Sequence, residues 1–348
     1  GNPGHLIREG ELLCNADAAD SLEALIQEGP DLLYRGDWAE TLIRDSENLG
    51  GQLSLADLSS YRVERRKPVV FRYRGHRCAI NPPPSPGGCL VAFALSVMSD
   101  WDSKGEQWGG NGHMLNLLRG MRAASLARHD FSMEAGLDRK KMEELLGEET
   151  IRAWQKSLQL NSLFSRGTTH ISVADAWGNI ASLTASNGEG CSYVLPGTGI
   201  MMNNMLGEED LNPGGFHLWK EGSRLASMMS PTVAELENGT RYALGSGGSN
   251  RIRSAVTQVL VNLLDFGMSL EEAVAAPRIH LEGERLSVEA GFSHQATEAL
   301  ESSVPQTDVW PGKNLFFGGV HAVSVTADGH FDGAGDPRRG GEVAFACK

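Results

Sequence analysis

The chain of 348 residues is 41% hydrophobic and 22% charged, a composition typical of a folded globular protein with one large domain or two modest ones. Its 44 acidic and 31 basic residues give a formal net charge of -13, which argues against a nucleic-acid or anionic-membrane partner and favours a small-molecule substrate. The five scattered cysteines form no CxxC pair and the ten histidines show no metal-ligand spacing, so we expect no metal and no cofactor. We also expect a soluble chain, because no secretion signal or membrane-spanning apolar run is visible; the compartment stays open.

The first half of the chain alternates helical patterns with short extended pieces. Apolar residues at helical spacing predict amphipathic helices at 17–29 and 37–51, each ending at glycine. A hairpin turning at Arg74-Gly75 follows, and then a proline-rich loop that cannot be helical. Three further helices are predicted, at 87–101, 113–130 and 138–158.

Strand patterns dominate the second half. Alternating residues predict one hairpin over 168–186, with Thr168 at its open end, and another over 318–337. Between them we expect a strand, a turn at Asn238-Gly239, a second strand, a glycine loop and an amphipathic helix. Ser269 and Glu272 have the spacing of a capping box at the start of another helix. These elements predict an α+β fold in which stacked sheets are covered by helices.

The stretch "SRGTTHISVAD" places Gly167 and Thr168 where a loop becomes a strand. Glycine before threonine is ordinary at such a turn, and that interpretation suffices for the stretch alone. A hydroxyl nucleophile needs a base, however, and the GxSxG elbow is absent. Cleavage of the Gly167-Thr168 bond would give Thr168 an α-amino group with a pKa near ~8, which is a usable proton acceptor close to neutral pH.

The loop "GSGGSNR" at 245–251 leads into a helix whose first backbone N–H groups are free to bind an anion. Such a loop suits either a phosphate or the oxyanion of an acyl-transfer intermediate, and a flexible turn is the simpler alternative. It lacks the GK[ST] ending of a phosphate loop, so a nucleotide enzyme is the weaker functional interpretation.

The stretch "NNMLGEEDL" places three carboxylates after two amides. The carboxylates of Glu208, Glu209 and Asp210 belong either to a solvated loop or to a site for a substrate ammonium group. His170 follows the two threonines, but it points to the opposite strand face from Thr169. We therefore expect a buried or edge histidine at that position and not a catalytic base.

Several ordered motifs together resemble a known family. The segments "TTHISVAD", "GN", "PGTGIMMNN", "SMMSPT", "GSGGSNRI" and "DPR" stand in the order found in the small subunit of γ-glutamyltranspeptidases, which are N-terminal-nucleophile hydrolases. The segments "YRVERRKPVVFRYRGH" and "NPPPSPGG" resemble the later part of their large subunit. The resemblance spans nearly the whole chain.

The resemblance implies a four-layer αββα sandwich and self-cleavage between Gly167 and Thr168. Residues 1–167 would be the mostly helical C-terminal part of a large-subunit-like region, residues 168–348 would be small-subunit-like, and the two would form one intertwined domain. The implied reaction transfers an acyl group from a small γ-glutamyl or related acyl amide, such as glutathione, to water or an amine.

Individual roles follow from matching positions in the family motifs. Thr168 matches the nucleophile, and Ser186 stands where the family has a supporting threonine. Ser227 matches the first of two serines that bind the substrate α-carboxylate. Gly247 and Gly248 resemble the oxyanion-hole pair, although counting back from Arg251 gives Gly248 and Ser249. We also expect substrate binding by four residues of the Asn-Asn loop: Asn204, Glu208, Glu209 and Asp210.

Departures from the family pattern point to an altered substrate. The second family serine is Met228 here, the polar residue after the Asn pair is Met205, and "GEEDL" replaces "DDF". The chain begins where the family's large subunit is already well under way, so its carboxylate-binding arginine has no match. We therefore expect weak activity on γ-glutamyl donors and a missing N-terminal segment. A glutaryl-type acylase and a non-catalytic remnant or partner module of the same fold remain alternatives.

Overall fold

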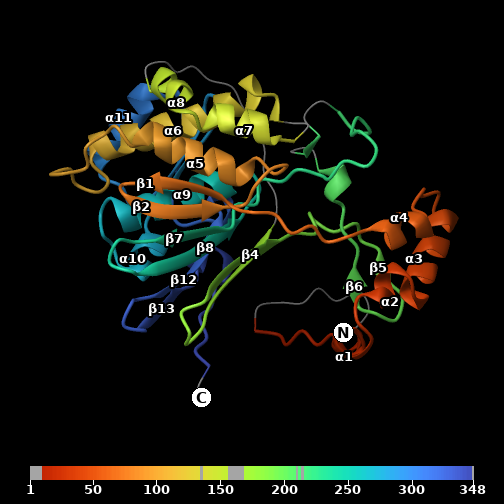
Figure 1. The fold of residues 1–348 in the computed structure, drawn as a ribbon. Coiled ribbons are helices and arrows are strands. Elements are labelled where there is room, and N and C mark those ends of the chain that lie inside the picture. Colours follow the sequence, from red (N-terminus) through yellow and green to blue (C-terminus); the bar gives the residue numbers. More distant parts are fainter. Residues whose placement is uncertain (1–9, 134–135, 156–167, 209–210, 213–214, 347–348) are drawn as a thin grey trace. The chain divides into compact units, whose positions relative to one another are not determined.

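The computed structural model describes residues 10–133, 136–155, 168–208, 211–212 and 215–346. Figure 1 shows the arrangement of its helices and strands. The helices are α1 Ala16–Glu28, α2 Asp31–Tyr34, α3 Asp37–Asn48, α4 Leu55–Ser60, α5 Gly87–Met98, α6 Asn111–Asp130, α7 Arg139–Leu145, α8 Glu148–Trp154, α9 Arg251–Leu264, α10 Leu270–Ala275 and α11 His294–Ser303. The strands are β1 Val69–Tyr73, β2 His76–Ile80, β3 Thr169–Ala174, β4 Ile180–Ala185, β5 Val194–Leu195, β6 Ile200–Met201, β7 Thr232–Glu235, β8 Arg241–Gly247, β9 Ile279–Glu282, β10 Arg285–Glu289, β11 Gln306–Trp310, β12 Gly319–Val325 and β13 Phe331–Ala334.

The chain forms two compact units. The smaller unit combines residues 1–66 with residues 189–204, and the larger combines residues 67–188 with residues 205–348. These units differ from the predicted pieces 1–167 and 168–348, which concern a covalent cut and not compactness. That division of the chain stays a prediction.

The smaller unit consists of α1 to α4 and the short β5–β6 pair. Side-chain caps start two of its helices: the Asn15 side chain accepts a hydrogen bond from the backbone of α1, and Ser54 and Asp57 form a capping box at α4. The Tyr193 hydroxyl donates to the Asp45 carboxylate at 2.8 Å, which joins the β5 segment to α3. Polar contacts of this kind supplement a small core around Ala39 and Leu42.

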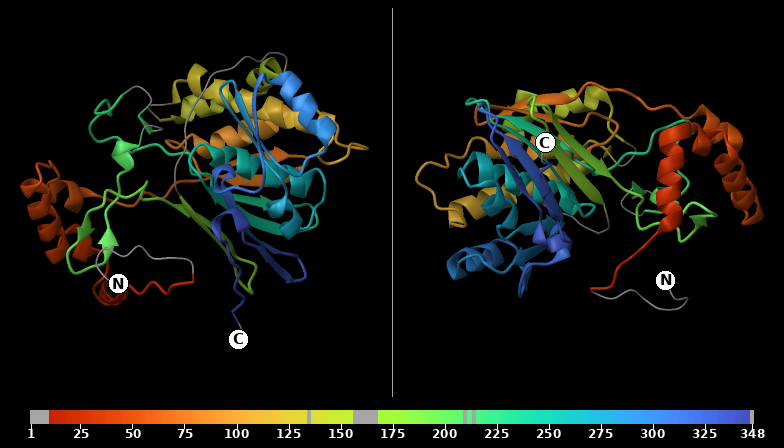
Figure 2. Two further views of the ribbon diagram at one scale, coloured as in Figure 1. Left: turned by 180° about the vertical axis from the view of Figure 1, so that it is seen from behind. Right: turned by 90° about the horizontal axis from the view of Figure 1, so that it is seen from below.

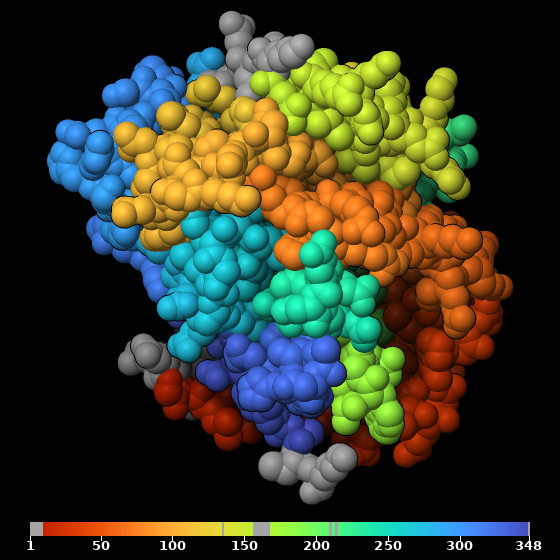
Figure 3. All heavy atoms as spheres, turned by 60° about the vertical axis from the view of Figure 1, so that its left-hand side comes forward, coloured from red at the N-terminus to blue at the C-terminus, as the bar shows by residue number. Residues whose placement is uncertain are grey.

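The larger unit is built on a six-stranded sheet with the order β1-β2-β7-β8-β12-β13, in which every neighbouring pair is antiparallel. Helices α5 and α9 pack on one face of this sheet, and α6 lies against α5 (Figure 1). Helices α5 and α9 are buried on nearly all sides, because each lies between the sheet and another element. The three hairpin turns β1–β2, β7–β8 and β12–β13 share one end of the sheet, where Figure 3 shows them in orange, teal and blue.

The β3–β4 hairpin packs on the other face of the six-stranded sheet, against β8 and β12 (Figure 2). Its inner face is polar: the Ser182 hydroxyl donates to the Leu244 carbonyl at 2.9 Å, and His170 is buried. Its outer face is apolar and exposed, with Ile171, Val173 and Leu183 each more than half exposed. The hairpin thus has the reverse of the usual polarity, with apolar side chains turned away from the sheet that it covers.

The structure confirms most predicted elements and corrects one. Both predicted hairpins, the helix after the glycine loop and the Ser269–Glu272 capping box are present. The single helix predicted over 138–158 is wrong: α7 ends at Leu145 and α8 begins after Gly147, since glycine is a poor residue for a helix interior. Within the described ranges no helix is long and apolar enough to span a membrane.

Candidate active site

Thr168 directly precedes β3, and Ser186 directly follows β4. Pairing of Thr169 with Ala185 across the hairpin brings the two hydroxyl residues opposite each other. The Thr168 Oγ1 hydroxyl donates to Ser186 Oγ at 3.5 Å, and Ser186 Oγ also accepts from the Gly188 N–H at 3.0 Å. The hairpin register therefore places the predicted supporting hydroxyl beside the predicted nucleophile. Gly167, the other predicted cleavage residue, lies outside the described residues.

The end of β8 lies against the backbone of Thr168. A Cβ atom built on Gly247 would be 1.8 Å from the Thr168 carbonyl oxygen, so only glycine allows this approach. Gly248 follows with a φ of 121° and Ser249 with a φ of 50°, both in the left-handed region. The chain thus turns sharply beside Thr168 before α9 begins at Arg251.

This turn leaves backbone donors available for an anion. The N–H groups of Arg251 and Ile252 donate to the carbonyls of Gly248 and Ser249. Among the described residues, the Gly248 and Ser249 N–H groups have no acceptor of their own. They lie at the N-terminal end of α9, whose dipole favours negative charge. Gly247 ends β8 opposite Gly319. Which two N–H groups form the oxyanion hole stays a prediction.

A pocket in the larger unit contains both the Thr168–Ser186 pair and the turn. Most of its surface is apolar, and Glu208, a buried residue that is 5% exposed, contributes a carboxylate. The described residues that line the pocket include no Lys, Arg or His. The lining residues are Thr168, Ser186, Gly188, Met205, Glu208, Leu211, Ser227, Met228, Met229, Ser249 and Ile252.

Ser227 lies in the pocket wall beside a serine that the motifs did not single out. The hydroxyls of Ser227 and Ser85 are 3.1 Å apart, and the Gly87 N–H donates to the Ser227 carbonyl. Ser85 belongs to the proline-rich loop "NPPPSPGG", whose family resemblance was the one signal that could have indicated it. Met205 and Met228, the two departures from the family pattern, also line this pocket.

Three other residues were predicted to bind substrate: Asn204, Glu209 and Asp210. Asn204 belongs to the smaller unit, where its Oδ1 atom accepts from the Glu189 N–H at 2.8 Å. Glu209 and Asp210 lie outside the described residues. In the described part of the chain, no group of three or more His, Cys, Asp or Glu side chains is placed to hold a metal ion.

His170 belongs to β3 and is buried, as expected. Its ring nitrogens contact the hydroxyls of Thr184 at 2.8 Å and Ser172 at 2.9 Å. Burial, and to a lesser extent the neighbouring His321, lowers the pKa of His170 to about 4. The ring is therefore neutral near pH 7, and it does not line the pocket.

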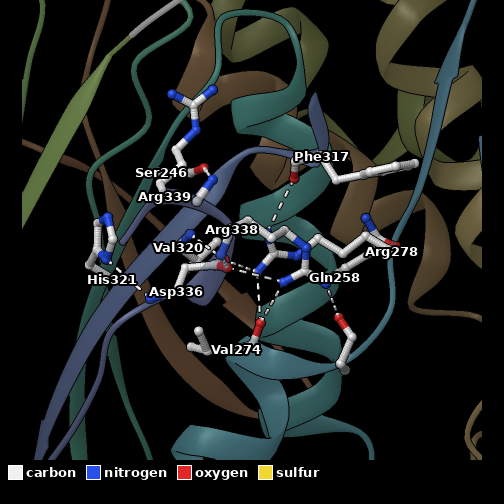
Figure 4. A network of polar contacts seen from close by, with 12 residues as sticks. Ser246, Gln258, Val274, Arg278, Phe317, Val320, His321, Asp336, Arg338 and Arg339 are labelled. Carbon is white, nitrogen blue, oxygen red and sulfur yellow. Dashed lines mark hydrogen bonds and ion pairs between the residues drawn. The ribbon is translucent and has the colours of Figure 1, made fainter. Parts of the chain in front are cut away.

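A buried ionic network supports β12 next to the turn (Figure 4). The Asp336 carboxylate pairs with Arg278 at 2.7 Å and with Arg338 at 3.1 Å, and it also accepts from the Val320 N–H. Burial opposes ionisation of Asp336, but the two arginine charges outweigh it and hold the pKa of the carboxyl below its ordinary value. The "DPR" motif thus holds β12 in place beside β8 and does not contribute to the pocket.

Comparison with known proteins identifies the family. The profile of the family described as gamma-glutamyltranspeptidase matches residues 2–346. The acylase ACY 1 proenzyme of Pseudomonas sp. strain V22 is 32% identical over 350 residues, covering 95% of this chain and 61% of its own length. The glutathione hydrolase proenzyme of Escherichia coli K12 is 27% identical over 363 residues, covering 96% of this chain and 62% of its own.

A solved structure agrees with these relatives. The cephalosporin acylase from Bacillus halodurans superposes with a TM-score of 0.76 at 25% identity, covering 97% of this chain and 63% of the acylase chain. The α+β fold of the N-terminal-nucleophile hydrolase type is thereby confirmed. The chain spans about three-fifths of the length of these relatives. Since the family profile matches nearly every residue, the chain belongs to the γ-glutamyltranspeptidase family.

Proposed function

We propose that the protein is an acyl-transferring amidohydrolase whose nucleophile is the Thr168 hydroxyl, released by cleavage of the Gly167-Thr168 bond. The observation that carries the proposal is the position of Thr168: its hydroxyl contacts Ser186 at 3.5 Å in the wall of a pocket that also contains Ser249 of the turn before α9. Nucleophile, supporting hydroxyl and anion-binding turn thus border one cavity.

The proposed self-cleavage uses the same hydroxyl. Thr168 Oγ1 attacks the Gly167 carbonyl carbon, and the peptide C–N bond breaks as an ester forms. The amide nitrogen takes the hydroxyl proton and becomes the Thr168 α-amino group. Water then hydrolyses the ester, which leaves a carboxylate on Gly167 and a free Thr168.

The proposed turnover repeats this chemistry on a substrate. The Thr168 amine takes the proton of its own hydroxyl as the oxygen bonds to the acyl carbon, and the Gly248 and Ser249 N–H groups stabilise the oxyanion. The alternative oxyanion pair is Gly247 and Gly248. Collapse breaks the C–N bond and passes the proton to the leaving amine. Water or a second amine then attacks the ester and releases a carboxylic acid or a new amide.

We propose a small γ-glutamyl or related acyl amide as the donor, with selectivity against an α-carboxylate. Met205 and Met228 place thioethers where an α-amino acid needs strong polar partners. Glu208 could pair with a substrate ammonium, whereas a substrate carboxylate would find the Ser227 hydroxyl, itself in contact with Ser85, but no Lys, Arg or His among the described lining residues. This composition supports an acyl group without the α-carboxylate over the full γ-glutamyl group.

We further propose that residues 1–167 and 168–348 stay together as one intertwined domain after the cut. Pairing of β2 with β7 supports this, because the two strands lie on opposite sides of Thr168 in the sequence. We also propose that an additional polypeptide segment covers the outer face of the β3–β4 hairpin. The exposed Ile171, Val173 and Leu183 support it, as does the additional length of the relatives outside the matched part.

Intact-mass analysis tests the proposal. The wild-type chain should separate under denaturing conditions into residues 1–167 and 168–348, whereas Thr168→Ala should stay in one piece and hydrolyse no acyl anilide. Thr168→Ser keeps a hydroxyl and serves as the matched control, so it should still be cut. An uncut wild-type chain whose residual amidase activity equals that of Thr168→Ala would instead identify a non-catalytic module of the same fold.

A further inference from the structure

Asn212 ties together the loop that forms one wall of the pocket. Its side chain is 8% exposed. Its Nδ2 group donates to the Leu206 carbonyl at 2.9 Å and to the Glu208 carbonyl at 2.7 Å, and its Oδ1 atom accepts from Trp219 Nε1 at 2.9 Å. The amide thus uses both N–H donors and its acceptor, so a side chain of the same size with other donors cannot replace it.

The segment that Asn212 holds carries three pocket-lining side chains: Met205, Glu208 and Leu211. Two of its backbone bonds are local: the Glu208 N–H donates to the Met205 carbonyl at 3.3 Å, and the Leu211 N–H donates to the Glu208 carbonyl at 3.2 Å. The Asn212 side chain adds two bonds to this segment, to the Leu206 and Glu208 carbonyls. Leu206 itself is 69% exposed, so its side chain packs little against the core.

We propose that Asn212 is a positioning residue that determines acyl selectivity by fixing Met205 and Glu208 relative to Thr168. The inference rests on the proposed function, because it concerns the acyl group that reaches Thr168. Asn212 does not line the pocket itself and acts through the two carbonyls it binds. If the Asn212 amide were lost, the Met205 thioether and the Glu208 carboxylate would no longer be held in a single position relative to the acyl group of the substrate.

Asn212→Asp is the sharpest variant, because it replaces the donating group by oxygen and keeps the size. Both bonds to Leu206 and Glu208 are lost, whereas the bond from Trp219 can persist. Trp219→Phe removes only that third bond and keeps an aromatic ring, so it provides a milder variant that should fold even where Asn212→Asp does not.

The chain offers a matched control in the core. Asn262 is 4% exposed, donates to the Ala273 carbonyl at 3.1 Å and accepts from Trp108 Nε1 at 2.8 Å. It makes the same type of contacts as Asn212 but does not hold the pocket wall. Asn262→Asp should therefore lower thermal stability and leave acyl preference unchanged.

The measurement is the rate of Thr168 acylation by the p-nitrophenyl esters of hexanoate, glutarate and 4-aminobutyrate, followed by intact mass. We expect Asn212→Asp to slow acylation by the preferred ester by about tenfold and to reduce the preference among the three esters by a similar factor. Trp219→Phe should shift the preference in the same direction by less.

The outcomes separate this inference from the proposed function. An unchanged preference in Asn212→Asp and Trp219→Phe, in a wild type that is acylated, overturns the role of Asn212 alone. An equal loss of preference in Asn262→Asp also overturns the role of Asn212, because the effect would then come from a general loss of stability and not from the pocket wall. A wild type that no ester acylates at Thr168 refutes the proposed function, and this inference with it.

Discussion

Gly247 lies where no side chain would fit. This glycine lets the backbone of Thr168 lie against the end of β8, and the same strand continues into the turn that presents the Gly248 and Ser249 N–H groups. The distance from the proposed nucleophile Thr168 to the proposed oxyanion donors is thus set by backbone contact and not by side-chain packing. Such a contact leaves little freedom for adjustment.

Gly247→Ala should therefore abolish self-cleavage and acyl transfer. The added methyl group would meet the Thr168 carbonyl oxygen at 1.8 Å, so the two strands must separate. Gly312 is the matched control, because a Cβ there meets no atom within 4 Å and Gly312→Ala should behave like wild type. Intact mass and anilide hydrolysis give the comparison. A Gly247→Ala chain that is cut and active at the wild-type rate would contradict the described contact.

Met228 should govern discrimination between γ-glutamyl and 4-aminobutyryl groups. Serine restores the hydroxyl that the family pattern has at this position, so Met228→Ser should raise kcat/KM for γ-glutamyl-p-nitroanilide by about tenfold relative to the 4-aminobutyryl compound. Met229→Ser removes a neighbouring thioether from the same pocket and should not change the ratio in this way. A wild type that already strongly prefers the γ-glutamyl anilide would show that the α-carboxylate site is intact.

The sequence predicted one part of the pocket and missed another for a physical reason. Thr168 and Ser186 meet because a hairpin register fixes which residues face each other, and alternation reveals that register. Ser85 and Ser227 meet although they are 142 residues apart. No local pattern encodes their contact, since it depends on how the proline-rich loop packs near α5. Leu211, Met229 and Ile252 were missed for the same reason.

Strand β3 carries a titratable group on its inner face. His170 contacts Thr184 and Ser172, and a Cβ on Gly245 would meet its ring at 2.4 Å, so β8 packs directly on the imidazole. A charged ring has no carboxylate partner in these contacts. The hairpin that follows Thr168, the proposed nucleophile, is therefore attached to the sheet through a histidine that must stay neutral.

Protonation of His170 at acid pH should lower the free energy of unfolding. The folded chain protonates His170 only near pH 4, whereas the unfolded chain does so near the ordinary pKa of 6.5. The unfolded state thus binds more protons between these values, and the free energy of unfolding should fall by up to about 3 kcal/mol as pH drops through that window. Urea titrations of wild type and His170→Asn at several pH values measure this.

The variant should show a flatter pH dependence between pH 6.5 and 4. His294→Asn removes a mostly exposed imidazole and serves as the control for the substitution itself. Equal slopes for wild type and His170→Asn would mean that the hairpin does not depend on a neutral His170.

Elements were predictable where periodicity was strong and local. Helix α9 follows a continuous apolar pattern and α10 starts at a capping box, and both are present. The break at Gly147 was missed because the charged pattern continues across it. Strands β9, β10 and β11 were also missed: β9 and β10 are short strands of a local hairpin, and β11 pairs in parallel with β10 across the intervening helix α11. The α+β class nevertheless followed from the confirmed elements.

The larger unit has an apolar face on the β3–β4 hairpin that no described segment of the same unit buries. Ile171 pairs with Leu183 across the hairpin, and both side chains point away from β8. Single exposed apolar residues are common, but an apolar stripe over two paired strands is typical of a surface that binds another element. The proposed additional segment would cover this stripe.

The isolated chain should therefore bind a hydrophobic dye at this face. Replacing Ile171 and Leu183 together by serine should lower the fluorescence of bound anilinonaphthalene sulfonate without lowering Tm, because neither side chain is buried. Leu49→Ser changes an exposed leucine in the smaller unit and should leave the fluorescence nearly unchanged. A longer product that includes the covering segment should not bind dye there. Unchanged fluorescence of the double variant would contradict an accessible face.

Because β2 and β7 pair and lie on opposite sides of Thr168 in the sequence, the proposed cut changes refolding of the sheet from a unimolecular to a bimolecular reaction. Before cleavage, both strands belong to one chain, and their pairing after unfolding is a unimolecular event at high effective concentration. After cleavage, the same sheet joins two polypeptides, so its recovery from the unfolded state becomes bimolecular and depends on dilution. The cleaved protein would then keep its structure because it unfolds slowly, and not because folding is reversible. The sheet would have to assemble correctly before the cut.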